Sequence, residues 1–236
     1  MAEISQSQAA KSVAVILVAA GRGRRLGGEI PKQYIPLGNA SSLRRAAEIF
    51  LGNQQVHWLL PVIHPDDREL CDEALAGLED ERLMTPVAGG GTRAESVRNG
   101  LEALETHSPS LVLIHDAARP FVPPEVIADV IAALGASEGA FAALSVVDAL
   151  WASEGDEAVA PVPREGLWRA QTPQGFDFAK ILAAHRAHDG SAADDVAVAR
   201  EAGMRVKLVP GSERNYKITT RADLERALGD LGFGRG

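Results

Sequence analysis

The sequence is poor in cysteine and in long apolar runs, and each scarcity excludes a class of protein. A single cysteine, Cys71, stands among 236 residues, which excludes an internal disulfide and a thiolate-rich metal site. No apolar run approaches the roughly 20 residues that a bilayer span requires, and the sequence shows no secretory signal pattern. We therefore expect a soluble, cytoplasmic protein with no membrane partner.

Basic residues are also in the minority. The chain has 24 lysines and arginines against 32 aspartates and glutamates, which gives a formal net charge of −8. A protein that binds a nucleic-acid backbone usually presents a basic face, so we expect no nucleic-acid partner. Hydrophobic residues make up 46% and charged residues 24% of the chain, and these proportions indicate an ordinary globular protein.

Several cations gather near the N-terminus, in residues 13–33, which read VAVILVAAGRGRRLGGEIPKQ. Residues 13–20 carry no charge, as in a central parallel strand. Gly21 and Gly23 follow, and glycine lets the backbone approach an anion closely. Four cations surround this turn in the sequence: Arg22, Arg24, Arg25 and Lys32. The segment predicts a site for a small anionic ligand such as a nucleoside triphosphate.

This loop matches neither of two better known phosphate-binding loops. The dinucleotide fingerprint G-x-G-x-x-G fails because Leu26 stands at its last position. The P-loop pattern fails because Glu29 and Ile30 follow Gly28. A solvated basic loop after a strand remains the alternative interpretation of this segment alone.

Short apolar runs alternate with helical patterns along most of the chain. This alternation predicts an α/β fold, a mostly parallel sheet with helices on both faces and ligands at the carboxyl ends of the strands. We expect a loose tail over residues 1–12 and a single domain over residues 13–236. The predicted strands are 13–19, 56–63, 83–87, 111–115, 139–147 and 205–209. The predicted helices are 43–51, 67–78, 93–105, 124–134, 179–187, 194–202 and 222–231, and Thr92 and Glu95 form a capping box before the third.

Residues 148–174 interrupt the alternation. They contain two short apolar pieces separated by an acidic, glycine-bearing turn, which predicts an extended hairpin inserted in the α/β body as a projecting β-arm. Such an arm is too small to be stable alone. We therefore expect its apolar side chains to pack on a second subunit of a homodimer: Trp151, Val159, Val162 and Trp168.

Polar residues follow two of the other predicted strands. A run of glycines, residues 89–91, precedes Arg93 and Ser96, and its backbone groups suit a phosphate or the edge of a base. A tight turn before a capped helix explains the same run equally well. After the strand at 111–115, Asp116 suits Mg²⁺ or a sugar hydroxyl and Arg119 suits a phosphate, while His115 is expected to be a packed residue.

The remaining candidates are scattered. Arg164, Arg169 and Lys217 lie beside turns and strand ends, where functional residues are frequent. His185, His188 and Asp189 have a spacing compatible with a metal site, but a solvated helix face is the preferred interpretation.

The motifs AAGRGRRL, PKQY, GGGTRAES, HDAARPF, LWRAQTPQ, ADDVAVA and NYKIT occur in this order over nearly the whole chain. In this set the sequence resembles the 2-C-methyl-D-erythritol 4-phosphate cytidylyltransferases of the non-mevalonate isoprenoid pathway. The resemblance implies a Rossmann-like nucleotidyltransferase fold, a homodimer, CTP and a sugar-alcohol phosphate as substrates, and Mg²⁺ or another divalent cation as cofactor. Two positions depart from the family pattern: Ala149 replaces a common threonine, and Gly91 replaces a common acidic residue.

The resemblance also implies roles for individual residues. Arg25 and Lys32 match the cations that stabilise the transition state. The nucleotide positions are Ala19, Ala20, Gly21, Gly90, Arg93 and Ser96. The acceptor-substrate positions are Asp116, Arg119, Thr172 and Lys217, with Arg164 contributed by the arm of the neighbouring subunit, and Asp116 is also the candidate metal ligand.

The chemistry needs no general base, since the attacking phosphate oxygen is already ionised at neutral pH. It needs alignment of that oxygen with the α-phosphorus and cations on the crowded oxygens. Three alternatives stay open: a pentitol (ribitol) phosphate cytidylyltransferase, a nucleotide-sensing module without catalysis, and a nicotinamide dehydrogenase, which the failed fingerprint disfavours.

Overall fold

A seven-stranded sheet forms the centre of the protein in a computed structural model that describes residues 11–22 and 30–233. The strand order is β11-β7-β10-β6-β1-β4-β5. All neighbouring pairs are parallel except those of β10, which runs antiparallel to β6 and β7. The strands are β1 (Val13–Ala19), β4 (Val56–Ile63), β5 (Val87–Ala88), β6 (Leu111–Asp116), β7 (Gly139–Ser145), β10 (Trp168–Asp177) and β11 (Val206–Pro210). The predicted α/β class with a mostly parallel sheet is confirmed.

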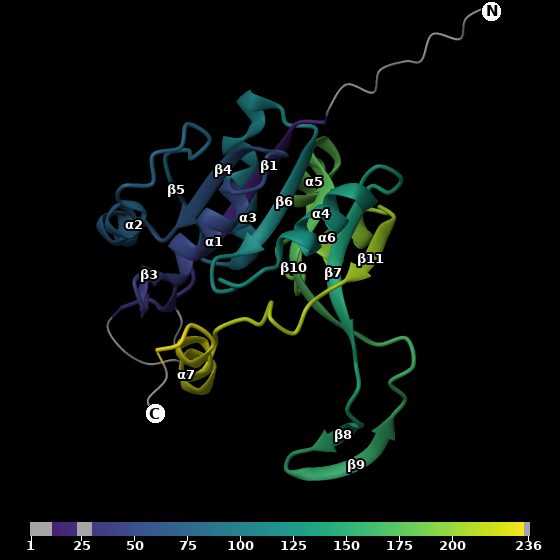
Figure 1. Cartoon of the computed structure of the whole chain (residues 1–236). Helices are drawn as coiled ribbons and strands as arrows, with labels where there is room; N and C mark the ends of the chain where they lie inside the picture. The colour runs from purple at the N-terminus through teal and green to yellow at the C-terminus, as the bar shows by residue number, and fades with distance from the viewer. Residues whose placement is uncertain (1–10, 23–29, 234–236) are drawn as a thin grey trace, which may run out of the picture.

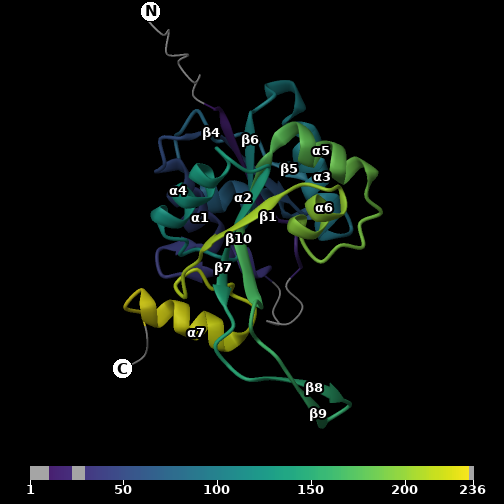
Figure 2. The ribbon, with the colours of Figure 1, turned by 90° about the vertical axis from the view of Figure 1, so that its right-hand side faces the viewer.

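Helices cover both faces of this sheet (Figures 1 and 2). Side chains alternate across β1, so Val15 and Leu17 enter one apolar core while Ala14 and Ile16 enter the other. The first core is closed by α1 (Ser42–Leu51), α2 (Arg68–Leu75) and α4 (Pro124–Ala133). The second is closed by α3 (Arg93–Ala103), α5 (Phe178–Ala187) and α6 (Asp195–Glu201). This burial on both faces explains why the central strands read as continuous apolar runs.

Several smaller elements complete the body around the central sheet. A short hairpin, β2 (Pro36–Leu37) and β3 (Ala40–Ser41), lies close to α7 (Arg221–Asp230), and a third apolar cluster of Leu37, Ile218 and Ala227 joins them. Three single turns of 3₁₀ helix are η1 (Lys32–Tyr34), η2 (Pro65–Asp67) and η3 (Glu105–His107). The cluster therefore holds the C-terminal region against the hairpin that follows η1, the turn that carries Lys32.

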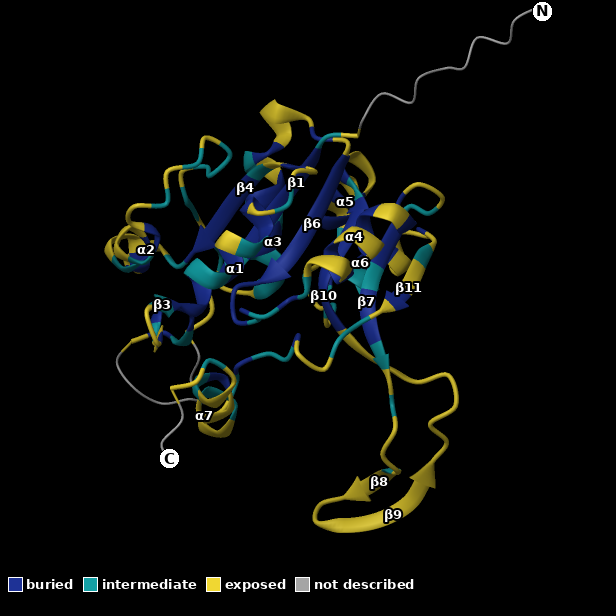
Figure 3. Cartoon of the chain, in the orientation of Figure 1, coloured by how far each residue is buried: buried dark blue, intermediate teal, exposed yellow. Residues whose placement is uncertain are grey.

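The predicted arm is a hairpin of β8 (Leu150–Glu154) and β9 (Glu157–Val162) that projects from the body (Figure 1). It is exposed along its length (Figure 3), and Trp151 is 60% and Val159 is 55% exposed. Its predicted C-terminal boundary was wrong, because the residues from Trp168 onward belong to β10 of the central sheet. The pattern missed this strand because its middle, QTPQ, is polar and yet buried.

Other boundaries shift by a few residues. The strand predicted at 83–87 reduces to β5, with Leu83 forming only an isolated bridge to Leu59. Among the helices in the described parts of the chain, none has the length and apolar character to cross a membrane.

Candidate functional site

A cavity of about 680 Å³ opens at the carboxyl ends of β1 and β6. It is bounded by the loop after β1, by η1, by the glycine-rich turn before α3 and by the segment that precedes α7. Its lining includes Ala19, Ala20, Gly21, Arg22, Lys32, Gln33, His64, Gly90, Gly91, Arg93, Ser96, Asp116 and Lys217. The cavity thus brings together six predicted nucleotide positions, the predicted catalytic lysine and two predicted acceptor positions, from five separate stretches of sequence.

The turn before α3 is glycine-rich because it packs too closely for side chains. A Cβ at Gly89 would lie 2.6 Å from Cβ of Ala20, at the end of β1. The predicted capping box is confirmed, with the Glu95 backbone N–H donating to Thr92 and the Glu95 carboxylate accepting from the Thr92 backbone. The Gly91 N–H donates to the same carboxylate at 2.7 Å, so a hydrogen-bonded turn holds the backbone against the cavity.

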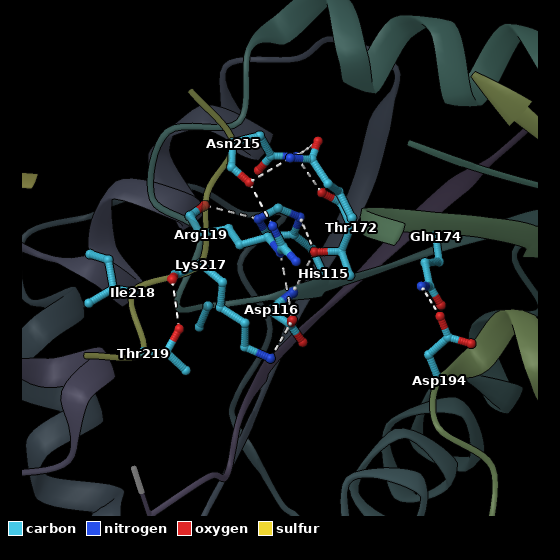
Figure 4. Close-up of polar contacts among 12 residues, drawn as sticks. His115, Asp116, Arg119, Thr172, Gln174, Asp194, Asn215, Lys217, Ile218 and Thr219 are labelled. Carbon is cyan, nitrogen blue, oxygen red and sulfur yellow. Dashed lines mark hydrogen bonds and ion pairs between the residues drawn. The ribbon is translucent and has the colours of Figure 1, made fainter. Parts of the chain in front are cut away.

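Asp116 is a buried carboxylate with cations on three sides. Its carboxylate oxygens lie 2.8 Å from Nζ of Lys217, 3.3 Å from Nε of Arg93 and 3.8 Å from Nε of Arg119. Figure 4 shows Lys217 and Arg119 beside it. Burial alone would raise the pKa of Asp116, but the charges of Arg93, Lys217 and Arg119 outweigh it and hold the pKa well below its usual range. Asp116 is therefore a fixed anion that orders three cations at the edge of the cavity.

Thr172 and His115 support Asp116 from behind. The Asp116 backbone N–H donates to Oγ1 of Thr172 at 3.1 Å, and the same hydroxyl lies 3.1 Å from Nδ1 of His115. Burial lowers the pKa of His115 to about 4, so the imidazole is neutral at physiological pH. His115 is a packed residue, as the sequence predicted. Thr172 is buried and contributes no atoms to the cavity lining.

The segment from Asn215 to Ile218 carries Lys217 into the site. The Asn215 carbonyl accepts a hydrogen bond from Nη1 of Arg119 at 2.6 Å, and its side-chain amide donates to the carbonyl of Thr172 at 2.8 Å. The Ile218 carbonyl accepts from Nζ of Lys32 at 3.0 Å. One short segment therefore connects Lys32 on η1 with the cations around Asp116. Figure 4 shows Asn215 and Lys217 of this segment beside Arg119 and Asp116.

The arginines of the N-terminal loop divide into two groups. Arg24 and Arg25 lie outside the described residues, so the predicted pairing of Arg25 with Lys32 stays a prediction. Arg22 lines the cavity but forms ion pairs with η2, at 3.0 Å to Asp66 and 2.8 Å to Asp67. These pairs tie the end of β1 to the turn after β4.

Arg164 does not reach the cavity of its own chain. It lies on the exposed arm, where its guanidinium donates to the carbonyl of Val147. Arg169 pairs with Glu213 at the surface. The position of Arg164 is compatible with the predicted contribution to a neighbouring subunit, and that contribution stays a prediction.

Two buried polar residues of the site were missed from the sequence. Gln33 follows Lys32, is 2% exposed, and donates its amide to the carbonyl of Ala19. Asp195, at the start of α6, is 1% exposed and lies 2.8 Å from Nη1 of Arg93. Both stand in motifs that carry the family resemblance, PKQY and ADDVAVA, but neither pattern shows that the polar side chain is buried.

The helix that carries His185 was expected to present a solvated face, and this expectation was wrong for His185. Its ring is 3% exposed and Nε2 lies 3.3 Å from Oδ1 of Asp195. His188 instead contacts Glu201 at 2.9 Å, and Asp189 is exposed. Sequence spacing did not predict the burial of His185 because α6 covers it from a later part of the chain.

Within the described ranges, no group of three or more histidine, cysteine, aspartate or glutamate side chains could hold a metal ion. Asp116, the candidate metal ligand, already contacts three cations, and their charge opposes a divalent ion at the same oxygens. The donor set therefore does not fit a magnesium ion held by the protein itself.

A mostly parallel sheet with a glycine-rich, cation-lined cavity at its carboxyl edge defines a nucleotidyltransferase of the α/β class. The family model of 2-C-methyl-D-erythritol 4-phosphate cytidylyltransferase matches residues 13–231. The chain belongs to this family.

Known proteins show the same relationship. A "2-C-methyl-D-erythritol 4-phosphate cytidylyltransferase" from Cereibacter sphaeroides is 50% identical over 216 residues, which cover 92% of this chain and 95% of that protein. A "Bifunctional enzyme IspD/IspF" from Rhodobacter capsulatus is 52% identical over 216 residues, 92% of this chain and 55% of that protein. The chain thus spans about half the length of this bifunctional relative. A crystal structure of "4-diphosphocytidyl-2C-methyl-D-erythritol synthase" superimposes with a TM-score of 0.81 at 32% identity, covering 94% of this chain and 99% of that chain.

Proposed function

We propose that the protein transfers the cytidylyl group of CTP to 2-C-methyl-D-erythritol 4-phosphate. An oxygen of the acceptor phosphate attacks the α-phosphorus, the bond between that phosphorus and the oxygen bridging to the β-phosphorus breaks, and pyrophosphate leaves with the electron pair. The products are 4-diphosphocytidyl-2-C-methyl-D-erythritol and pyrophosphate. Membership of the family supports this reaction over transfer to a pentitol phosphate.

The single observation that carries the proposal is the joining of two anion sites in one cavity. The end of β1 and the turn before α3 offer backbone groups for the nucleotide, with Ala19, Ala20, Gly21, Gly90, Arg93 and Ser96 as its proposed contacts. Lys217 and Asp116 line the same cavity, and Arg119 contacts Asp116. Two phosphorylated substrates placed this way present the acceptor oxygen to the triphosphate.

Lys32 lines the same cavity. Its ammonium group contacts the Ile218 carbonyl, next to Lys217, and its side chain lines the cavity near the end of β1. We assign Lys32, together with Arg25, to the charge that develops on the α-phosphate oxygens in the transition state. We assign four residues to the acceptor substrate: Asp116, Arg119, Thr172 and Lys217. Arg119 and Lys217 are the cations that contact the acceptor, and Asp116 and Thr172 orient these cations.

The arm is proposed to complete the site of a second copy in a homodimer. Its exposed apolar residues include Trp151 at 60%, Val159 at 55% and Val162 at 38%, and an isolated hairpin of this size is not stable alone. Packing on a second subunit would bury these side chains and bring Arg164 to the acceptor of that subunit. Sedimentation of the purified protein tests this, since a monomer at assay concentration would exclude it.

We expect a divalent cation, proposed to be Mg²⁺, to bind together with the triphosphate. The cations that contact Asp116 disfavour a second positive ion at its carboxylate. Titration of Mg²⁺ by calorimetry should give heat in the presence of CTP and none with the protein alone. We expect no nucleic-acid or membrane partner and a cytoplasmic location.

The decisive experiment is a pyrophosphate-release assay that crosses four nucleotides with two acceptors. CTP, UTP, ATP and GTP are each tested with 2-C-methyl-D-erythritol 4-phosphate and with ribitol phosphate. The proposal predicts efficient release only from CTP with methylerythritol phosphate. Preference for ribitol phosphate would favour the pentitol alternative, and CTP binding without release would favour a nucleotide sensor.

A further inference from the structure

Asp195 lies behind the cavity wall and contacts a residue that lines the cavity. It is 1% exposed at the start of α6, on a different element from every cavity-lining residue. Its Oδ2 lies 2.8 Å from Nη1 of Arg93. A buried carboxylate is costly unless a charge partner compensates it, so the position of Asp195 is explained by the cation in front of it.

The guanidinium of Arg93 spans two carboxylates at once. Nε donates to Oδ1 of Asp116 at 3.3 Å while Nη1 contacts Asp195. Two contacts through different nitrogens fix the plane of a guanidinium group, which one contact alone does not. Burial by itself would lower the pKa of Arg93, but Asp195 and Asp116 outweigh burial and raise the pKa above its ordinary value.

Asp195 is itself held in place by the strand that the sequence failed to predict. Gln174 of β10 accepts hydrogen bonds from the backbone N–H groups of Asp195 at 3.1 Å and Val196 at 3.2 Å. Its amide donates to Oδ2 of Asp194 at 2.9 Å (Figure 4), and Asp194 caps the helix through the N–H of Ala197. The start of α6 is therefore fixed to the sheet, and Asp195 presents a preorganised carboxylate to Arg93.

The balance of charge explains why a second carboxylate is useful. Asp116 already contacts Lys217 and Arg119. If Asp195 were neutral, Asp116 would be the remaining ion-pair partner of Arg93 among the residues that the structure describes, and Arg93 would compete with these two cations for it. Asp195 draws Arg93 away from that competition, toward the start of α6.

We infer that Asp195 is a positioning residue for nucleotide binding, which holds the Arg93 guanidinium at the cavity lining for contact with the phosphates of CTP. The inference rests on the proposed function, because it takes Arg93 as a contact of the nucleotide. It adds to that function a residue that never touches the substrate and acts only through Arg93.

The test is a double-mutant cycle of four proteins: the wild type, Asp195→Asn, Arg93→Gln and the double variant. CTP affinity is measured by calorimetry, and KM for each substrate by pyrophosphate release. In the Arg93 background the substitution should weaken CTP binding by roughly 10- to 100-fold, by analogy with the loss of an outer partner of a metal ligand. KM for CTP should rise more than KM for the acceptor. In the Arg93→Gln background the same substitution should change CTP binding little.

Asp177→Asn is the matched control. Asp177, the last residue of β10, caps α5 through the N–H of Lys180 and does not line the cavity. Asparagine caps helices as well as aspartate does, so this variant should bind CTP like the wild type. It removes the same charge from the same region of the protein without touching Arg93.

Arg93→Lys keeps the inference testable if Asp195→Asn does not fold. A lysine is a point charge and cannot span two carboxylates in a fixed plane, so its CTP affinity should fall nearly as far as that of Arg93→Gln. Wild-type affinity in Arg93→Lys, or an equal loss from Asp195→Asn in both backgrounds, would overturn the inference while leaving the function intact. A wild-type protein that neither binds CTP nor releases pyrophosphate would overturn both.

Discussion

Replacing Asp116 with asparagine removes the anion that three cations share. Asp116 is buried, and its oxygens contact Lys217 at 2.8 Å, Arg93 at 3.3 Å and Arg119 at 3.8 Å. Arg119 is itself largely buried, and the substitution leaves it beside two other cations without the carboxylate. We therefore expect both lower stability and loss of acceptor binding.

The size of the stability loss follows from the burial of the partners. Removing one partner of a buried ion pair costs about 3–5 kcal/mol. The Lys217 side chain is 37% exposed, so solvent screening weakens its share and the lower end, about 3 kcal/mol, is expected. For a chain of this length each kcal/mol shifts Tm by about 2–4 °C, which predicts a fall of roughly 6–12 °C.

Calorimetric melting of the two proteins gives this shift directly. Sulfate should raise the Tm of Asp116→Asn more than that of the wild type, because the uncompensated cations then bind an anion. Asp189→Asn is the control, since Asp189 is 77% exposed and its loss should change stability by less than about 0.5 kcal/mol. If the Tm of Asp116→Asn equals that of the wild type and sulfate does not raise it further, the proposed charge arrangement is refuted.

Three further predictions concern catalysis, the arm and pH. Lys32→Ala should lower kcat by roughly 100-fold or more, measured by pyrophosphate release; wild-type turnover would rule out its proposed role. Arg164→Ala should raise KM for the acceptor much more than KM for CTP, and equal changes in steady-state kinetics would contradict the proposed reach of the arm. Because burial lowers the pKa of His115 to about 4 from 6.5, the unfolded state binds more protons between these values. Stability is then fully present above pH 6.5 and falls by about 3 kcal/mol as the pH drops to 4. Urea titrations of His115→Gln should show a flatter profile, and an unchanged profile would count against a neutral buried imidazole.

The sequence predicted those parts of the fold in which local pattern and tertiary burial agree. β1 and β4 were predicted with their observed bounds, because strands covered on both faces must be apolar throughout. The capping box at Thr92 was predicted because its hydrogen bonds are local. The strand ends were predicted as the place for ligands, because strand and helix alternation indicates a mostly parallel sheet, and the cavity opens at the carboxyl ends of β1 and β6. The contact between Asp116 and Arg93 was not predicted.

The errors arise where polar residues are buried by distant parts of the chain. The middle of β10 was assigned to the arm because Gln171, Thr172 and Gln174 are polar, but each is hydrogen-bonded inside the protein. Asp195 reads as part of a helix start, and its contact with Arg93 depends on the fold bringing α6 beside α3. These partners lie far away in the sequence, and a local sequence pattern does not show them. Neither β10 nor the role of Asp195 was therefore predictable from such a pattern.

The direct test of the central claim is ³¹P NMR of the wild-type protein with CTP, 2-C-methyl-D-erythritol 4-phosphate and Mg²⁺. Attack of the acceptor phosphate on the α-phosphorus predicts that the acceptor signal is replaced by a diphosphate diester while pyrophosphate appears in equal amount. Release of CMP, or consumption of CTP with the acceptor signal unchanged, would contradict it.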